Sequence, residues 1–420
     1  MPPYEIHSSF SPKGDQPAAI DALLAGCLKP KKHQVLLGIT GSGKTFTMAK
    51  VIEKMQRPTL IMSPNKTLAA QLYQEFRGFF PNNAIHYFVS YYDYYQPEAY
   101  IPHTDTYIEK DAKINDVIDR LRHEAVQDVL SRKDAIVVAS VSCIYNIGSP
   151  EDYQNIALNV KINQKINRKE FLSHLTALQY QRNDIEFGPD TFRIRGEIIE
   201  VFIVTGRELI RLELSGDTIE SLAVSENSIA PSYSAIEKYT FYPAKFWVTP
   251  EDKLKIAMQN IRLELQDRLQ VLRKENTLVE AQRLQQRTNY DLELIEESGY
   301  CHGIENYSRH FDGRKEGEPP YTLLSYFPKD FLTVIDESHV TVPQLRGMYA
   351  GDRSRKRTLV EFGFRLPSAL GNRPMKFNEF EKLVGLWQHT QRRWRRSGAS
   401  DCRHEPTQRK CILDGAEWLL

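Results

Sequence analysis

A glycine-rich stretch offers the clearest chemistry in the sequence, because residues 38–45 read GITGSGKT. A glycine, four residues and then Gly43, Lys44 and Thr45 form the pattern of a phosphate-binding loop. Glycines let backbone N–H groups curl around phosphate oxygens, Lys44 can reach the terminal phosphates, and Thr45 can bind magnesium. The pattern predicts a site for ATP and Mg²⁺, with an incidental glycine turn as the alternative. Its residues are Gly38, Ile39, Thr40, Gly41, Ser42, Gly43, Lys44 and Thr45.

A pair of carboxylates supplies a second chemical signal in FLTVIDESHV. The apolar run 331–335 predicts a buried strand, and Asp336 and Glu337 follow it directly. Asp336 is expected to hold Mg²⁺ through water, and Glu337 to orient or deprotonate the hydrolytic water. A capping aspartate at a turn is the alternative for a lone Asp-Glu pair, but the phosphate-binding loop favours catalysis. Lys44, Asp336 and Glu337 are therefore the candidate catalytic residues.

Two residues ahead of this loop suit a nucleobase. In FSPKGDQPAAI the ring of Phe10 can stack on a base, and the amide of Gln16 can read its edge. The same stretch also predicts a helix start with Pro17 in the first turn, and the residues alone do not separate the two interpretations.

Tyrosines crowd the segment VSYYDYYQPEAY. In a regular strand Tyr92 and Tyr94 would face one side and Tyr91 and Tyr95 the other, so both faces would be aromatic. Prolines at 97 and 102 interrupt strand pairing, which favours a finger that leaves a sheet over a central strand. Such rings can stack on bases without reading sequence. An aromatic core cluster is the alternative.

Alternating strands and helices must position these residues. Apolar runs predict strands at 35–37, 59–62, 84–89, 135–139 and 331–335, and helical periodicity predicts helices at 46–55, 67–76 and 114–130. This order indicates a doubly wound α/β domain with a mainly parallel sheet. Ligands of such sheets bind at the carboxyl ends of the strands.

Composition limits the class of protein. The chain has 420 residues, of which 26% are charged and 41% hydrophobic, which suits two or three globular domains. No run of about 18 apolar residues and no signal-like start occurs, so we expect no membrane span or secretory signal. Five scattered cysteines favour reduced thiols and a cytosolic protein. The net charge of +1 gives no overall argument for nucleic acid binding.

Later segments change character. Residues 150–242 are rich in predicted strands, and Arg193 and Arg195 alternate with apolar neighbours so that both face one side. Residues 251–297 form an amphipathic pattern that breaks after about Leu284, which favours a helical subdomain packed on the α/β domain over a free coiled coil. The basic run 351–357 could bind phosphates through Arg353, Arg355, Lys356 and Arg357, or could be plain surface charge.

Long motifs in a fixed order carry a resemblance. They are GITGSGKT, YYDYYQPEAYIPHTDTYIEKDAKINDVIDRLRHEA, ASVSCIYNIGSPE, FRIRGEIIEVF, DESHVTVPQLRGMYAGDRSRK and LVEFGFRLPSALGNRP. From Phe10 to about Leu383 the chain resembles the UvrB family of the excinuclease ABC system, the damage-verifying ATPases of bacterial nucleotide excision repair. The resemblance implies a RecA-like P-loop motor of helicase superfamily 2. It implies motor parts at 1–150 and 326–383, a β-rich domain at 151–245 and a helical subdomain at 246–325.

The resemblance also implies partners. Residues 91–114, here called the tyrosine hairpin, would pass between the strands of damaged DNA, with contacts from Tyr91, Tyr92, Tyr94, Tyr95 and Glu98. Glu109, Lys110 and Asp111 are expected to hold the hairpin base through ion pairs. The β-rich domain would dock on the family's loading partner, UvrA, through Arg182, Arg193, Arg195 and Glu213. The nuclease of the system, UvrC, would act on the resulting complex.

The sequence departs from the family after about Leu383. Residues 384–420 show no helical or strand periodicity, and we expect an aberrant, poorly ordered tail in place of a second motor domain. Cys402, His404 and Cys411 lack the paired spacing of a zinc site. Motors of this class use an arginine from the second domain for hydrolysis. Two hypotheses therefore stand: an ATP-driven damage verifier, and an ATPase-deficient module that only binds UvrA.

Overall fold

A seven-stranded sheet forms the centre of the computed structural model, which describes residues 2–28, 33–39, 41–226, 230–248 and 250–384 and the backbone of two later strands. The strand order is β19-β1-β18-β17-β2-β8-β3, and every pair is parallel except β19 with β1. The strands are β1 (His33–Gly38), β2 (Thr59–Ser63), β3 (Ala84–Phe88), β8 (Ala135–Ser140), β17 (Leu332–Ile335), β18 (Leu386–Arg392) and β19 (Ile412–Leu413).

Helices cover both faces of this sheet, as a parallel sheet requires. Along β2, Leu60 and Met62 join one buried cluster, whereas Ile61 joins the other. One face carries α1 (Gln16–Leu28), α2 (Lys44–Met55) and α3 (Lys66–Phe79). The other carries α4 (Asp116–Ser131), α5 (Pro150–Asn155), α10 (Leu323–Tyr326), α11 (Ser338–Glu361) and α12 (Phe377–Leu383). The predicted doubly wound α/β class is confirmed.

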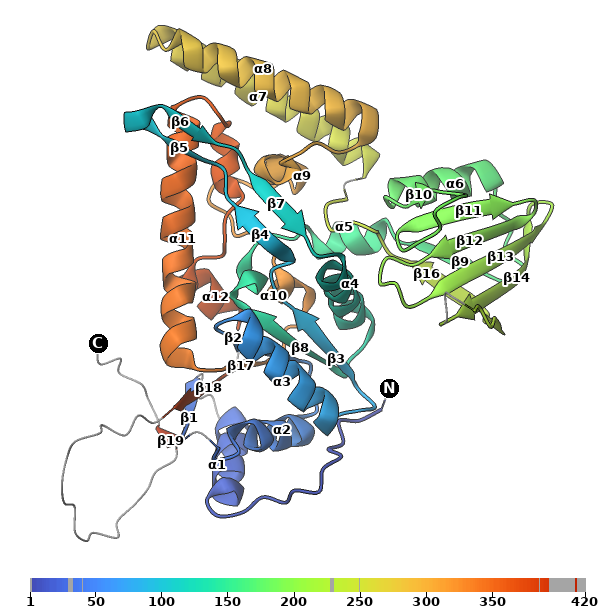
Figure 1. Ribbon diagram of the computed structural model, residues 1–420, viewed down its shortest axis with the longest axis vertical. Coiled ribbons are helices and arrows are strands. Elements are labelled where there is room, and N and C mark those ends of the chain that lie inside the picture. The colour runs from blue at the N-terminus through green and yellow to red at the C-terminus, as the bar shows by residue number, and fades with distance from the viewer. Residues whose placement is uncertain are drawn as a thin grey trace.

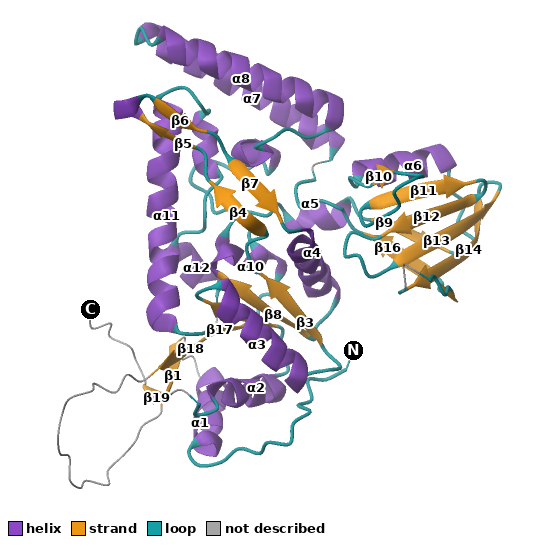
Figure 2. Ribbon diagram, in the orientation of Figure 1, coloured by secondary structure: helices purple, strands orange, loops and turns teal. Residues whose placement is uncertain are grey.

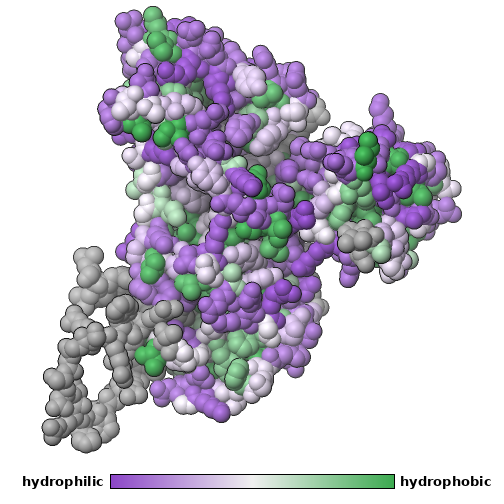
Figure 3. All heavy atoms as spheres, in the orientation of Figure 1, coloured by the Kyte–Doolittle hydropathy of each residue, from purple (hydrophilic) through white to green (hydrophobic). Residues whose placement is uncertain are grey.

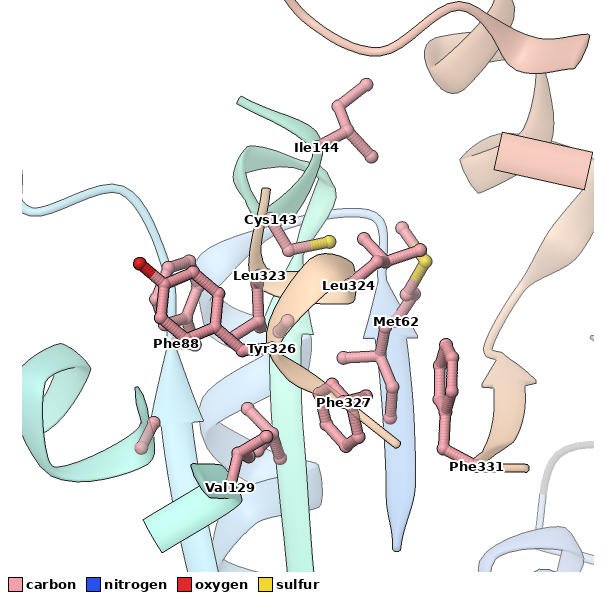
Figure 4. Close-up of a cluster of buried hydrophobic side chains, with 14 of the residues drawn as sticks. Met62, Phe88, Val129, Cys143, Ile144, Leu323, Leu324, Tyr326, Phe327 and Phe331 are labelled. Carbon is pink, nitrogen blue, oxygen red and sulfur yellow. The ribbon is translucent and has the colours of Figure 1, made fainter. Parts of the chain in front are cut away.

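The segment that follows the helical subdomain returns to this core. The short 3-10 helix Val141–Ile144 packs in the same core, and another 3-10 helix spans Pro367–Gly371. Figure 4 shows α10 side chains gathered with residues of the sheet, among them Leu323, Leu324, Tyr326, Met62 and Phe88. Residues more than 200 positions apart therefore build one core, which places β17 inside the sheet.

The expectation that no strand follows Leu383 is wrong for Leu386–Arg392. This segment, β18, pairs in parallel with both β1 and β17. A strand between these two satisfies backbone N–H and C=O groups of both, whatever side chains it carries. Cys402, His404 and Cys411 lie outside the described residues.

The tyrosine hairpin leaves the sheet between β3 and α4. Its root pairs β4 (Tyr92–Gln96) with β7 (Asp111–Ile114), and its distal half pairs β5 (Ala99–Ile101) with β6 (Thr106–Ile108). The two halves are separated at Pro97, and a 3-10 helix at Pro102–Thr104 forms the tip. Figure 1 shows β4 and β7 between the central sheet and the helix pair α7–α8. The predicted hairpin is confirmed as a structural element.

The β-rich domain has its own core around buried strands and α6 (Arg168–Ala177). Its six-stranded sheet contains β10 (Gln181–Arg182), β11 (Thr191–Arg195), β12 (Ile198–Phe202), β13 (Leu209–Ser215), β14 (Thr218–Ser225) and β15 (Ser234–Ala235). A two-stranded sheet pairs β9 (Leu158–Lys161) with β16 (Lys238–Phe241). Figure 2 shows this domain as strands with α6 beside them, set to one side of the motor.

The helical subdomain is a pair of packed helices, α7 (Glu251–Lys274) and α8 (Leu278–Ser298), followed by short helices at Ile304–Tyr307 and Ser308–Phe311. The expected break after Leu284 is wrong, because the chain reverses at Asn276, whose φ of 59° is left-handed. Asparagine tolerates this conformation better than most residues. The predicted apolar stripe is confirmed as buried, at Ile261, Leu265, Leu269 and Leu272.

The surface is mostly polar, as expected when the apolar side chains are gathered in separate cores. On the face drawn in Figure 3, hydrophilic residues cover most of the molecule and hydrophobic ones form scattered patches. Within the described ranges, no helix combines the length and the apolar character needed to cross a membrane.

The return of α10 to the sheet gives a first prediction. Leu323 is fully buried, so Leu323→Ala should lower the free energy of unfolding by about 2–5 kcal/mol, the usual range for a buried leucine. Leu263→Ala is the control, because Leu263 is 59% exposed on α7 and its loss leaves no cavity. Urea unfolding followed by circular dichroism measures both. Equal midpoints for the two variants would contradict the packing of α10.

Candidate nucleotide site and nucleic-acid interface

The phosphate-binding loop lies between β1 and α2, at the carboxyl end of its strand. Gly41 and Gly43 have φ of 79° and 74°, conformations that L side chains rarely adopt. A Cβ on Gly43 would lie 2.3 Å from Nε2 of Gln16, and one on Gly38 would lie 2.6 Å from Oγ of Ser42. The backbone conformation therefore requires glycine at 41 and 43, while Gly38 leaves room for the Ser42 side chain. Thr40 lies outside the described residues.

Lys44 begins α2 and folds back along the loop. Its Nζ donates hydrogen bonds to the carbonyl oxygens of Gly38 and Ile39, at 3.0 and 3.1 Å. The ammonium group is therefore positioned over the loop at the positive end of a helix, where anions bind.

The two predicted carboxylates lie at the same edge of the sheet. The backbone N–H of Asp336 donates to Met62 O at 2.7 Å, which continues the pairing of β17 with β2. Glu337 has a left-handed φ of 44° and precedes α11, and Thr341 Oγ1 donates to Asp336 O at 2.7 Å. A non-glycine residue in this conformation costs about 1–3 kcal/mol, and such strain concentrates at functional sites.

One cavity of about 610 Å³ brings the two motifs together. It is lined by Gly41 to Thr45 from the loop and by Asp336 and Glu337 from the turn after β17. Glu337 is buried, with one carboxylate oxygen 3.4 Å from His339 Nδ1. The arrangement combines backbone donors, an ammonium group and two carboxylates, which suits a nucleoside triphosphate with a divalent cation.

Phe10 and Gln16 line the same cavity. Phe10 is 71% exposed and has an edge contact with Phe46, at 6.4 Å between ring centres. Gln16 is the first residue of α1, so the helix start and the cavity lining coexist. Its Oε1 accepts from the N–H of Lys13 and its Nε2 donates to Ser42 O, both at 3.0 Å. The amide therefore ties this segment to the phosphate-binding loop.

The part of the cavity that α3 provides was not predicted from the sequence. Gln71, Leu72 and Glu75 line the cavity, together with two phenylalanines of the same helix. Gln71 Nε2 donates to Glu75 Oε1 at 2.8 Å. No local motif marks these residues, because their place at the site depends on the packing of α3 against the sheet.

The tyrosines do not alternate as a regular strand would. The ladder between β4 and β7 shifts register between Tyr92 and Tyr94, so Tyr92 and Tyr95 lie on the same side and stack at 4.7 Å. The expected separation of Tyr92 from Tyr95 is therefore wrong, because a β-bulge adds one residue.

The four rings differ in accessibility. Tyr91 lies under the guanidinium of Arg122, which is 4.4 Å from its ring centre, and its hydroxyl is 2.9 Å from that of Tyr92. Burial raises the pKa of Tyr92 to about 12 and raises that of Tyr91 further. Tyr94 and Tyr95 are 50% and 47% exposed. Tyr91 and Tyr92 are partly buried, so Tyr94 and Tyr95 are the more exposed of the four rings.

Glu98 is not placed for the expected DNA contact. Its side chain is buried and accepts hydrogen bonds from Arg365 Nε at 2.9 Å and from the hydroxyl of Tyr107 at 2.6 Å. Arg355 also donates to its backbone oxygen. The carboxylate therefore anchors the hairpin to the segment after α11. A contact between this carboxylate and a DNA phosphate would also bring two negative charges together.

The predicted roles of other charged residues have different outcomes. Lys110 pairs with Glu305 at 2.6 Å, so its expected role in holding the hairpin base is confirmed. Lys356 is buried and pairs with Asp352 at 2.9 Å, which contradicts a phosphate contact from that residue. Arg355 pairs with the same aspartate at 2.8 Å. Within the basic run, Arg353 and Arg357 remain exposed.

Comparison with known proteins adds three family models and close relatives. The matching models are UvrB third helical domain (residues 252–313), UvrB interaction domain (158–247) and Type III restriction enzyme, res subunit (9–193). UvrABC system protein B of Methanobrevibacter smithii is 55% identical over 384 residues, which are 91% of this chain and 59% of the relative. The Bacillus licheniformis protein of that name is 56% identical over 382 residues, 91% of this chain and 58% of the relative.

The chain belongs to the UvrB family. It spans slightly less than three fifths of the length of these relatives. The UvrB interaction domain model covers β9 to β16, and the third helical domain model covers α7 to α9.

Within the UvrB interaction domain, three of the four predicted docking residues share one outer face. Arg193 and Arg195 lie two residues apart on β11, and Ile198 pairs with both Arg195 and Glu213 in one row across the sheet. Arg193 already forms an ion pair, with Nε 2.6 Å from Glu200 Oε2. Glu213 pairs with Arg211 at 2.7 Å. Arg182 is exposed on β10 and pairs with Asp184 at 3.0 Å. Arg195 is exposed and is the clearest charge that this UvrB face offers.

The two kinds of tyrosine give a second prediction. Tyr94→Ala should change the free energy of unfolding by less than about 1 kcal/mol, because the ring is half exposed. Tyr91→Ala should cost more, up to the roughly 3–5 kcal/mol of a large aromatic deletion, since Arg122 would lose one of the rings on which it stacks. Thermal unfolding measures both. A larger loss for Tyr94→Ala would indicate that the exposed rings belong to a core.

Proposed function

We propose that the chain is the damage-verifying subunit of UvrABC excision repair, an ATP-dependent motor with limited strand-separating activity. In this proposal UvrA loads it on damaged DNA, the tyrosine hairpin enters between the strands, and UvrC then incises. The single observation that carries the proposal is the cavity that joins the phosphate-binding loop to Asp336 and Glu337, on a chain of the UvrB family.

The cavity supports specific roles in binding Mg-ATP. Backbone N–H groups of the loop and the Lys44 ammonium would hold the phosphates, while Thr45 and Asp336 would hold Mg²⁺. Phe10 would stack on the base, and Gln16 keeps one amide hydrogen for its edge beyond the one donated to Ser42. Bound ATP supplies the phosphoryl group whose transfer to water drives the motor.

Glu337 is proposed to prepare that water. Its carboxylate is buried beside the loop and can accept a proton from, or orient, a water at the terminal phosphate. Cations among the described lining residues are Lys13 and Lys44. An arginine that stabilises the transferred phosphate raises the rate of this reaction by orders of magnitude, and the described residues that line the cavity include none. Nucleotide binding is therefore the first property to test, and hydrolysis is the second.

DNA binding is proposed to use the exposed rings. Tyr94 and Tyr95 can stack on unpaired bases, with each ring contributing about 1–3 kcal/mol regardless of sequence. Lesions share weak stacking and distortion, so a sequence-independent aromatic surface suits damage verification. The anchored root behind these rings keeps them in place, because Tyr91 and Glu98 are held by Arg122 and Arg365.

The nucleotide site gives a third prediction. Lys44→Ala should abolish binding of Mg-ATP, because it removes the ammonium that faces the phosphates, and should leave the unfolding midpoint unchanged. Lys54→Ala is the matched control, since Lys54 lies on the same helix and is half exposed. Isothermal titration with a non-hydrolysable ATP analogue measures both. Unchanged affinity in Lys44→Ala would refute the site.

Docking gives a fourth prediction. Arg195→Glu should weaken association with UvrA at least tenfold without altering nucleotide binding, because the exposed charge lies on a domain separate from the motor. Arg193→Glu is a poorer test, since it would place a second carboxylate against Glu200 and destabilise the sheet. Lys238→Glu, an exposed charge on β16 of the same domain, is the control. Equal UvrA affinity of Arg195→Glu and wild type in a pull-down titration would contradict the docking face.

A further inference from the structure

A cluster of charged side chains lies outside the nucleotide cavity, buried at His86 and Glu124 and more exposed at Asp128 and Arg207, whose side chains are 29% and 60% exposed. His86 of β3 is 3% exposed, with Nδ1 3.3 Å from Glu124 and Nε2 3.0 Å from Asp128, both on α4. The Arg207 guanidinium, from the turn between β12 and β13 of the β-rich domain, is 2.6 Å from the same Glu124 oxygen. A single buried carboxylate therefore contacts the motor and the β-rich domain.

This cluster joins the two elements that flank the tyrosine hairpin in the sequence. β3 ends at Phe88, just before the tyrosine hairpin begins, and α4 starts at Asp116, just after the hairpin ends. His86 and Glu124 therefore join the element that enters the hairpin to the element that leaves it. The hairpin root is closed further by the N–H of Asn115, which donates to Tyr91 O at 2.8 Å.

The turn that carries Arg207 is shaped to approach α4. Gly206 has a φ of 73°, and a Cβ there would lie 3.1 Å from Cδ of Arg120 on α4. A larger residue would strain the backbone and crowd that helix. Figure 1 shows α4 on the side of the motor that faces the β-rich domain. The close approach is thus independent evidence for a built contact between the domains.

We propose that Glu124, held between His86 and Arg207, is a positioning residue that ties both roots of the tyrosine hairpin to the β-rich domain. A pull on the β-rich domain is then transmitted through Arg207 and Glu124 to α4 and, through His86, to β3. The contact involves only this chain, so its test requires no nucleotide, DNA or partner and stands apart from the proposed function.

Charge balance favours a protonated His86 over a metal ion at this cluster. Two carboxylates face one arginine and the imidazole, so the imidazolium makes the cluster neutral, whereas a divalent cation beside Arg207 would leave a positive excess. Both ring nitrogens also face a carboxylate, as a doubly protonated ring requires. Burial lowers the pKa of His86, but Asp128 and Glu124 outweigh burial and raise the pKa above its usual value.

Other titratable groups surround the cluster without replacing the histidine. Asp128 raises the pKa of the Tyr242 phenol beyond the effect of burial, and Arg132, directly after the same helix, interacts with that aspartate. Neither tyrosine nor arginine changes charge near neutral pH. A raised histidine pKa stabilises the folded state below its unfolded pKa of about 6.5, and the stabilisation is lost as pH rises through the folded value.

Hydrogen exchange of the free chain tests the mechanical coupling. Arg207→Gln should speed amide exchange several-fold in residues 89–96 and 111–116, with the phosphate-binding loop unchanged. Arg207→Lys should keep nearly wild-type exchange, because it retains the charge, and the exposed Lys238→Gln is the control on the same domain. Faster exchange confined to residues 203–209 would overturn the proposal.

The pH profile provides a readout that a purely structural role would not move. His86→Gln keeps hydrogen-bonding atoms but cannot titrate, so the difference in unfolding midpoint between wild type and His86→Gln should be largest near pH 6 and shrink toward pH 9. A pH-independent difference would contradict the imidazolium. A Zn²⁺-dependent rise in the wild-type midpoint, lost in His86→Gln, would overturn the proposal in favour of a metal site.

Discussion

The parallel pairing of β17 with β2 is the constraint on which the candidate nucleotide site depends. It places Asp336 and Glu337 at the edge of the sheet where β1 ends, although nearly 300 residues separate them from the phosphate-binding loop. The chain meets this constraint by returning through α10, whose buried leucines pack on the same sheet. Both inserted domains lie in the long excursion between β8 and β17, and the sheet brings the two ends of that excursion together at the site.

Anchoring of the tyrosine hairpin follows a different physical rule. Its exposed rings, Tyr94 and Tyr95, project from a root that buried ion pairs hold in place. Glu98 with Arg365 holds one arm, and Lys110 with Glu305 holds the other. Breaking a buried pair by removing one partner costs several kcal/mol, about 3–5, because the remaining charge stays buried. The root is therefore stiff, and the proposed Glu124 contact extends this stiffness to the β-rich domain.

Short sequence patterns predicted the features that neighbouring residues determine. Apolar runs located β1, β2, β3, β8 and β17, and the glycine and carboxylate motifs located both sides of the cavity. The failures lie where distant segments decide the outcome. Glu98 was assigned to DNA, but its partner Arg365 lies 267 positions away in sequence. The bulge beside Tyr94 and the reversal at Asn276 depend on pairing and packing that no periodicity contains, and the α3 side of the cavity has no motif at all.

The central claim is that one cavity binds Mg-ATP between the loop, Phe10 with Gln16, and the two carboxylates. Hydrogen exchange of the wild-type chain, with and without a non-hydrolysable ATP analogue and Mg²⁺, tests this claim most directly. We expect slower exchange at residues 10–16, 38–45 and 336–339 together, with the β-rich domain unaffected. Protection confined to another segment, or no protection at saturating nucleotide, would contradict it.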